Sequence, residues 1–321
     1  MKRIVCIIIL TLIFISMKAQ DPAFSQFYAS PLYINPALAG TTECGRLGLN
    51  YRLQWPGFDA YNSFGVTYDQ NLEDINSGFG VQVISFMPDD ILRQYSINLF
   101  YSYQIKVTQK LYIRAGLSGG IRMHDFNTGS IVLPDGTTGS SEGLSNQLYY
   151  VPDFSIGVYA TYDGKYYAGF SVAHFTSGIG NGENARYFKN ASTIKYTVHG
   201  GLDIPLDLRE EYSLSPNFIY QHQDGFDNFY LGLYANLKMI TTGLWYKNNV
   251  CFTSPDMNSH ALCALVGISF EKIKIGYSYD FNITGVGLKS HGSHEVSLQW
   301  NFCIYQGPQK RVIRAIKSPQ F

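Results

Sequence analysis

The sequence predicts an all-β protein: a transmembrane antiparallel outer-membrane β-barrel of about 14 strands, with an N-terminal plug-like segment and a periplasmic C-terminal tail. Three observations predict this fold class. Only 15% of the 321 residues are charged, whereas a soluble domain has about a quarter. Apolar residues alternate with small or polar ones over lengths that suit a membrane-crossing strand. The chain also opens with an export signal.

Composition excludes other classes of protein. The long apolar run at residues 4–15 is shorter than the roughly 18 to 20 residues of a spanning helix. The 24 basic and 24 acidic residues balance without a basic block, which argues against nucleic-acid binding. An aromatic content of 15% argues against disorder.

The N-terminus has the three parts of a secretory signal peptide. Lys2 and Arg3 precede the apolar run, and Ala19 provides a small residue at its end. We expect cleavage after Ala19, which makes residues 1–19 the signal peptide; a cut after Gln20 and a retained anchor helix are the alternatives. Cleavage after Ala19 removes three basic residues and no acidic one, so the mature chain has 21 basic against 24 acidic residues, a net charge of −3.

Period-two alternation predicts the strands. Leu47, Leu49, Tyr51, Leu53 and Trp55 alternate with Gly48, Asn50, Arg52 and Gln54. The same pattern occupies residues 95–105, 111–123, 228–237, 272–281 and 295–302, with Phe100 as an exception. Runs of about 9 to 12 residues match the length of a tilted strand in a bilayer. The apolar face is therefore expected to contact lipid, and the small or polar face to line a lumen.

Strand starts are expected near residues 45, 60, 77, 92, 110, 152, 165, 192, 211, 227, 239, 259, 272 and 293. An even number suits a closed barrel, which leaves no strand edge unpaired in lipid. One set of connections is short, at residues 106–109, 163–164, 205–210 and 271. The other set is longer, at residues 125–150, 176–191, 248–259 and 284–292. Short periplasmic turns and long outer loops would place both chain ends in the periplasm.

The remaining boundaries follow from segments that lack alternation. Residues 20–43 hold three prolines and form the expected plug-like segment, because proline does not fit a central strand. Residues 44–304 form the expected barrel. Residues 305–321 form a basic periplasmic tail with Lys310, Arg311, Arg314, Lys317 and a terminal Phe321. This tail is either solvated or docks a periplasmic partner.

Charged residues of both signs share the lumen-facing parity. Arg52, Arg114, Arg122, Lys195, Lys272 and Lys274 fall on the same face as Asp203, Asp280 and Glu295. Mixed signs favour internal ion pairs or plug contacts over an anion-selective channel.

Four cysteines follow the signal peptide. Cys44 precedes the first expected strand and Cys303 ends the last. Closure of a barrel pairs these two strands, so we predict a disulfide between Cys44 and Cys303, with free thiols as the alternative. Cys251 and Cys263 are a second candidate pair, of undetermined geometry.

No motif predicts catalytic, cofactor-binding or metal-binding residues. The seven histidines lack the HExxH spacing, and His291 with His294 is the closest pair. No GxSxG motif is present. We therefore expect a protein that is not an enzyme and needs no cofactor.

A resemblance adds what alternation does not supply. The opening QDPAFSQFYASPLYINPALAG, the Trp55-Pro56-Gly57 turn and the closing IRAIKSPQF resemble the PorP/SprF family of Bacteroidetes outer-membrane proteins. The resemblance implies a role in type IX secretion and gliding motility, in export or surface anchoring of large C-terminally tagged adhesins or proteases. It also implies contacts with periplasmic lipoproteins and an OmpA-like peptidoglycan-binding protein.

Two other functions fit a barrel of this size. A FadL-like transporter of hydrophobic small molecules would need a continuous apolar pocket in the lumen. An outer-membrane lipid hydrolase would need a serine and a histidine close together at the membrane boundary.

Overall fold

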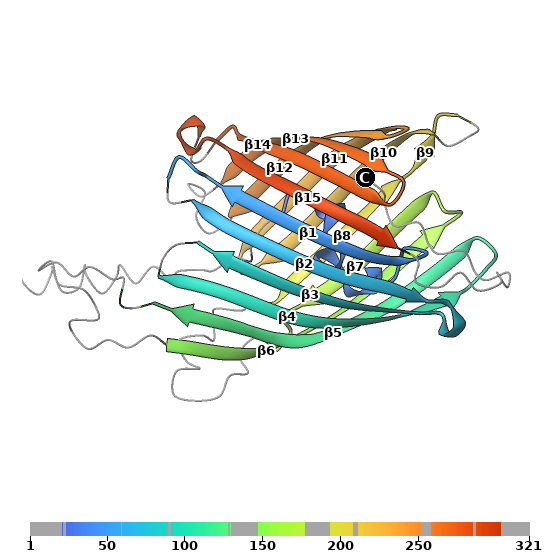
Figure 1. The fold of residues 1–321 in the computed structure, drawn as a ribbon, viewed down its shortest axis with the longest axis horizontal. Coiled ribbons are helices and arrows are strands. Elements are labelled where there is room, and N and C mark those ends of the chain that lie inside the picture. The colour runs from blue at the N-terminus through green and yellow to red at the C-terminus, as the bar shows by residue number, and fades with distance from the viewer. Residues whose placement is uncertain are drawn as a thin grey trace, which may run out of the picture.

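Antiparallel strands close into a barrel around the N-terminal segment in the computed structural model (Figure 1). The structure describes residues 21, 24–58, 60–88, 91–127, 129, 147–176, 193–207, 211–251, 258–284 and 287–302. The strands form one sheet of 15, of which β9 (Ile204–Pro205) has only two residues, so 14 strands make the wall. The sheet closes where β1 (Gly45–Gln54) pairs with β15 (Ser293–Phe302), from Gly45 opposite Phe302 to Gln54 opposite Ser293.

The other strands pair with their neighbours in chain order, apart from β8, which pairs with β10. They are β2 (Tyr61–Leu72), β3 (Ser77–Met87), β4 (Leu92–Lys106), β5 (Leu111–Phe126), β6 (Gln147–Tyr162), β7 (Tyr166–Ala173), β8 (Lys195–Leu202), β10 (Tyr212–Gln223), β11 (Phe226–Leu237), β12 (Ile240–Cys251), β13 (Ser259–Phe270) and β14 (Ile273–Asn282). Two 3₁₀ turns, η3 (Glu73–Ile75) and η6 (Leu288–Ser290), lie in connections.

The predicted strands are confirmed, with two shifted starts. Twelve of the 14 starts agree within one residue. β6 begins at Gln147 rather than near residue 152, because it pairs with β5 as far as Phe126. β8 begins at Lys195 rather than near residue 192, opposite Ala173 at the end of β7.

Connection lengths divide the barrel into two ends. The connections at residues 73–76, 107–110, 163–165, 203–211, 238–239 and 271–272 lie at one end, called the short-turn end. The connections at residues 127–146, 174–194, 252–258 and 283–292 lie at the other, called the long-loop end, together with a tight turn at residues 224–225. The connections at residues 55–60 and 88–91 also lie at the long-loop end and are short. The four long connections therefore share one end as predicted, but not every connection at that end is long.

The two faces of the wall differ as the alternation predicts. On β13, Leu262 and Val266 face outward and are exposed, whereas Cys263 and Leu265 face inward and are buried. Phe100, the exception to the pattern, is buried on the lumen side against Leu32. An apolar residue on the inner face therefore marks a contact with the segment inside the barrel.

That segment consists of Asp21 and residues 24–40, called the plug below. It contains the 3₁₀ turn η1 (Phe27–Ala29), the one-turn helix α2 (Pro31–Ile34) and the 3₁₀ turn η2 (Pro36–Leu38). Each proline begins a short helix, where its missing N–H costs no hydrogen bond. Figure 1 shows these elements in blue inside the ring of strands. No helix in the described part of the chain has the length and apolar character to span a membrane.

The plug runs through the lumen from one end to the other. Asp21 contacts Lys195, the first residue of β8, at the long-loop end. Gly40 donates its N–H to Asp69, near the end of β2 at the short-turn end. The first described residue therefore lies at the opposite opening from Phe302, the last. The position of both chain ends in the periplasm stays a prediction, because residues 1–20 and 303–321 lie outside the described residues.

Candidate functional site

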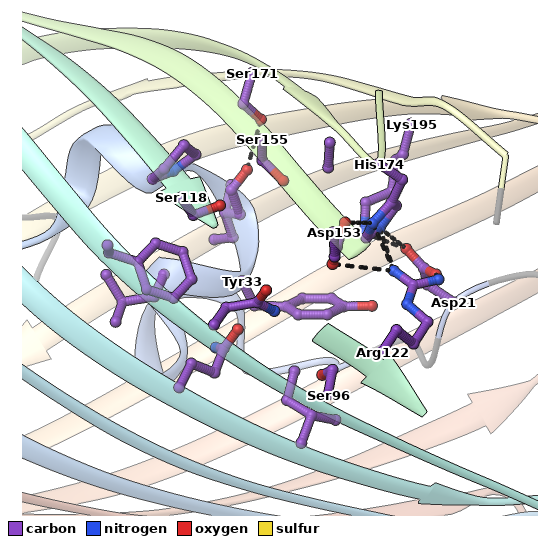
Figure 2. A pocket seen from close by; sticks show the side chains of 18 of the residues that line it. Asp21, Tyr33, Ser96, Ser118, Arg122, Asp153, Ser155, Ser171, His174 and Lys195 are labelled. Atoms are coloured by element: carbon purple, nitrogen blue, oxygen red, sulfur yellow. Dashed lines mark hydrogen bonds and ion pairs between the residues drawn. The ribbon is translucent and has the colours of Figure 1, made fainter. Parts of the chain in front are cut away.

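The contact between the plug and the inner wall is the candidate site, and it begins with an ionic cluster at the long-loop end (Figure 2). The Asp21 carboxylate lies 2.7 Å from Lys195 Nζ, 2.8 Å from His174 Nε2 and 3.3 Å from Arg122 Nη1. Asp153, on β6, adds a second carboxylate, 2.7 Å from His174 Nδ1 and 3.5 Å from Arg122 Nη2. Each of the five side chains is at most 10% exposed. The cluster therefore holds buried charges that need one another.

The charge of Asp21 depends on these neighbours. Burial alone would raise the pKa of its carboxyl, because desolvation disfavours the charged form. The interactions with His174, Lys195 and Arg122 outweigh burial and hold the pKa of Asp21 well below its usual value. The Asp21 contact is therefore an ion pair at neutral pH.

A second buried group of charges receives the backbone of the plug. The N–H groups of Ser25 and Gln26 donate to the two Glu295 carboxylate oxygens at 2.6 and 3.2 Å. The Gln26 side chain donates to the Glu295 backbone carbonyl at 2.9 Å and accepts from Ser297 Oγ at 2.5 Å. A turn of chain that would otherwise bury unpaired N–H groups is thus satisfied by β15.

Cations from two strands balance the carboxylates of this second group. Arg52 lies 2.7 Å from Asp280 and 3.3 Å from Glu295, and Lys247 lies 2.9 Å from Asp280. Ser25 Oγ donates to Asp280 at 2.7 Å. The plug therefore completes a network whose other members come from β1, β12, β14 and β15.

Aromatic packing holds the middle of the plug. The Phe27 ring lies 5.0 Å from that of Tyr230 and 5.1 Å from that of Trp245, measured between centroids. The Tyr28 hydroxyl lies 3.0 Å from that of Tyr167 and also bonds Asn217 at 3.2 Å. These inward aromatic residues replace the small or polar residues expected on the lumen face. Their large buried area stabilises the plug inside the wall.

Polar contacts hold the plug again at the short-turn end. Asn35 Nδ2 donates to the carbonyl of Val158 at 2.9 Å and lies 3.2 Å from His199 Nε2. Arg114 donates to the carbonyls of Ala39 and Gly40 at 2.5 and 2.8 Å. The wall thereby supplies hydrogen-bond donors to the two carbonyl groups at the end of the plug.

Glycine on the wall permits close approach of the plug. A Cβ on Gly116 of β5 would lie 2.4 Å from the backbone nitrogen of Ala37. A Cβ on Gly78 of β3 would lie 2.1 Å from the carbonyl oxygen of Ala39. The backbone of the plug therefore packs directly on the backbone of the wall.

Little space is left beside the plug. One cavity of about 60 Å³ lies around Tyr33, whose ring points toward the Asp21 cluster (Figure 2). A second cavity of about 170 Å³ lies near Arg52 and Lys195. In the described ranges, neither is a continuous apolar pocket of the kind that a transporter of hydrophobic molecules would need. A larger apolar recess of about 520 Å³ is lined by the outward-facing Tyr166 and Phe218 and also by Tyr167 and Asn217, which bond Tyr28 of the plug.

The structure brings together most of the charged residues that share the predicted lumen parity. Arg52, Arg122, Lys195, Asp280 and Glu295 contact the plug or its ion pairs, and Arg114 bonds the plug backbone. Asp203 accepts instead from Ser215, and Lys272 is exposed in a turn. The sequence did not indicate four charged or titratable residues of the site, which are Asp21, Asp153, His174 and Lys247. The available signal for Asp21 was the excess of basic over acidic residues in the predicted lumen-facing set, six against three.

The predicted tail residues Lys310, Arg311, Arg314, Lys317 and Phe321 lie outside the described residues. So does Cys303. Cys44 is disulfide-bonded, and a Cys44–Cys303 bridge stays a prediction. Cys263 is a free, buried cysteine, so the alternative bridge between Cys251 and Cys263 is wrong.

The described residues of the site give little support for metal binding or catalysis. Within the described residues, no three His, Cys, Asp or Glu side chains are grouped as metal ligands. His174 bonds Asp21 and Asp153, and His199 bonds Asn35. These histidines hold the plug, and neither is bonded to a serine nucleophile.

The comparison with known families decides the identity. The family model described as "Type IX secretion system membrane protein PorP/SprF" matches residues 16–300. The chain belongs to the PorP/SprF family. This PorP/SprF protein is thus an outer-membrane β-barrel of type IX secretion, and its family is not an enzyme family. No curated protein is similar enough in sequence to count as a relative.

Solved structures show the same architecture. The CymD monoaromatic hydrocarbon channel is 10% identical, with a TM-score of 0.51, over 86% of the PorP/SprF chain and 93% of its own. The Ralstonia pickettii toluene transporter TbuX is 10% identical, with a TM-score of 0.50, over 85% and 94%. A Pseudomonas aeruginosa FadL homologue is 11% identical, with a TM-score of 0.48, over 85% and 94%. At these identities the likeness to CymD and TbuX shows the barrel fold alone.

Proposed function

We propose that this PorP/SprF protein is a non-enzymatic component of type IX secretion and gliding motility that acts as a permanently filled barrel. It would assist the export or surface anchoring of large C-terminally tagged adhesins or proteases. The observation that carries the proposal is the plug, which crosses the lumen and is held at both ends. A barrel filled in this way serves as a fixed membrane platform for partners rather than as a pore.

The energetics of the plug support this function. Asp21, Arg52, Asp280 and Glu295 are all buried and charged partners of the plug or its network. Withdrawing the plug would take Asp21 away from Lys195 and leave that buried cation unpaired, which costs about 3 to 5 kcal/mol for a single broken buried pair. The carboxylates of Glu295 and Asp280 would keep their cations but lose the hydrogen bonds from Ser25 and Gln26. Opening the lumen would break several of these contacts together.

The proposed partners are those that the resemblance to the PorP/SprF family implies, and the end of the wall indicates on which side they would be met. β15 ends at Phe302 at the short-turn end, and short turns face the periplasm in outer-membrane barrels. The basic tail at residues 305–321 would therefore begin in the periplasm. There it would meet periplasmic lipoproteins or an OmpA-like peptidoglycan-binding protein of the secretion machinery.

Two assays test this function, one on a strain that lacks the protein and one on the purified protein. A deletion strain is expected to lose secretion or surface display of tagged proteins, and purified full-length protein to give no conductance in planar bilayers. A variant that lacks residues 24–38 provides the conducting control, with its barrel checked by heat-dependent migration in SDS gels. Steady wild-type conductance together with normal secretion in the deletion strain would favour the FadL-like transporter instead.

A further inference from the structure

Two histidines lie on the outer face of the wall, close to the long-loop end. His260 is the second residue of β13 and His294 is the second residue of β15. Their parity is that of the exposed residues Leu262 and Val296, so both rings belong to the outer surface. Neither residue takes part in the plug contacts.

Each of these histidines has the same kind of partner on the preceding strand. The Tyr246 hydroxyl lies 2.9 Å from His260 Nδ1, and the Tyr277 hydroxyl lies 2.8 Å from His294 Nδ1. The Tyr246 and His260 rings are also stacked, with planes 13° apart. A hydroxyl that donates to Nδ1 places the proton of a neutral imidazole on Nε2. In that tautomer, the N–H on Nε2 of each ring is bonded to no described residue.

The depth of the histidines can be measured along the strand. Beyond His260, the outward-facing residues of β13 are Leu262, Ala264, Val266, Ile268 and Phe270. Ten residues at about 3.3 Å each, tilted by about 40°, span about 25 Å, which is the height of the apolar band of a membrane barrel. His260 therefore marks the edge of the hydrocarbon, where lipid headgroups begin. Val296, Leu298 and Trp300 form the same apolar row below His294.

We propose that His260 and His294 form a binding surface for the phosphate groups of bilayer lipids at the long-loop end. Each Nε2–H would donate to a phosphate oxygen, the strongest acceptor that a lipid offers at this depth. Tyr246 and Tyr277 are positioning residues, because they fix which ring nitrogen carries the proton. The occupant is a lipid headgroup, since the row below each histidine contacts acyl chains.

A third outward-facing histidine supplies a matched contrast. His222 is also second from the long-loop end of its strand, β10. Its Nδ1 lies 3.0 Å from the Asp227 carboxylate, which also accepts from the Tyr220 hydroxyl, and its ring lies beside that of Tyr196. A carboxylate next to the ring repels a phosphate, so His222 is not part of the proposed surface.

The test compares lipids that differ only in the phosphate. Full-length protein in detergent is titrated with phosphatidic acid or with diacylglycerol of the same acyl chains, and bound lipid is counted by native mass spectrometry. We expect wild type to prefer phosphatidic acid, and the double variant H260F/H294F to lose about 5-fold in affinity per histidine. H222F should bind as wild type does. Y246F/Y277F should bind more weakly than wild type while retaining both imidazoles.

Three results would overturn the proposal. The first is equal binding of phosphatidic acid by wild type and H260F/H294F, with both shown to be folded by heat-dependent gel migration. The second is equal binding of phosphatidic acid and diacylglycerol by wild type. The third is competition by soluble glycerol 3-phosphate at the concentration of the lipid, which would indicate a site for free phosphate.

Discussion

The carboxylate of Asp21 lies 2.7 Å from Lys195 Nζ, across 174 positions of sequence. This contact joins the first described residue of the chain to the first residue of β8. Because both side chains are nearly buried, removing one partner leaves an uncompensated buried charge, which costs far more than breaking an ion pair on the surface. It fixes the plug at the opening opposite to the start of β1.

Replacing Asp21 by asparagine tests this contact. The D21N change keeps the size of the side chain but leaves Lys195 buried without its carboxylate, while Arg122 keeps only Asp153. We expect a loss of about 3 to 5 kcal/mol in the stability of the docked plug. Protease cleavage within residues 24–40, measured on folded barrels, should rise accordingly.

An exposed ion pair provides the control for D21N. Asp163 lies 3.3 Å from Lys110, but the two side chains are 39% and 59% exposed. D163N should therefore change stability by no more than about 1 kcal/mol. Equal protease sensitivity of D21N and D163N would contradict a structural role for the Asp21 cluster.

Acidity should release the long-loop end of the plug in a defined direction. The pKa of Asp21 is lowered in the folded protein, so its contribution is complete above the unfolded value of about 3.9. It is lost as the pH falls below that value toward the folded pKa. Wild type should resist protease down to about pH 4 and become cleavable in stronger acid. D21N should lack the step attributable to Asp21, and a plug released near pH 6 would argue against this assignment.

Close packing at Gly116 predicts an effect of a single methyl group. In G116A the new Cβ would clash with the backbone of Ala37, and backbone atoms cannot move aside by a change of side-chain rotamer. We expect a loss of about 1 to 3 kcal/mol and greater cleavage of the plug. G119A on the same strand is the control, since its Cβ would meet only the movable ring of Phe154 at 3.2 Å. Unchanged cleavage in G116A would contradict backbone contact at this point.

The cysteines give a chemical test of barrel closure. Peptide mapping without reduction is expected to link Cys44 to Cys303, at the short-turn end of the β1–β15 pair. Cys263, which is buried and free, should react with a maleimide only after unfolding. Detection of Cys44 bonded to Cys251, or of Cys44 as a free thiol, would refute the predicted pairing.

The basic tail is expected to dock a periplasmic partner. Exchange of Lys310, Arg311, Arg314 and Lys317 for glutamine should abolish co-purification of crosslinked periplasmic partners while the barrel stays folded. The matched control exchanges Lys106, Lys110, Lys165 and Lys238, four basic residues exposed at the short-turn end. If both sets of changes reduce co-purification equally, the effect is one of general charge and the tail has no docking role.

The wall was predictable from sequence because its determinants are local. Alternation and turn residues locate a strand such as β13 without knowledge of its partners. The plug contacts were not predictable in this way, because Asp21 and Lys195 meet only after the barrel has closed. Phe100 was the residue from which a contact could be predicted, because an apolar residue on the polar inner face indicates an apolar segment inside the barrel. Tyr230 and Trp245 are also large aromatic residues on the inner face. They indicate a contact inside the barrel only when the plug is known to cover that face.

The end-to-end course of the plug has a consequence for biogenesis. The chain passes through the barrel as the plug and then forms β1, the first strand of the wall. The barrel therefore encloses the segment that precedes its first strand. Drawing Phe27 and Tyr28 lengthwise through a finished barrel would force these bulky residues past the inward-facing aromatic side chains of the wall. The seam between β1 and β15 should therefore seal last, around a segment already in place. The machinery that inserts this protein into the membrane must keep β1 and β15 apart until the plug is in place.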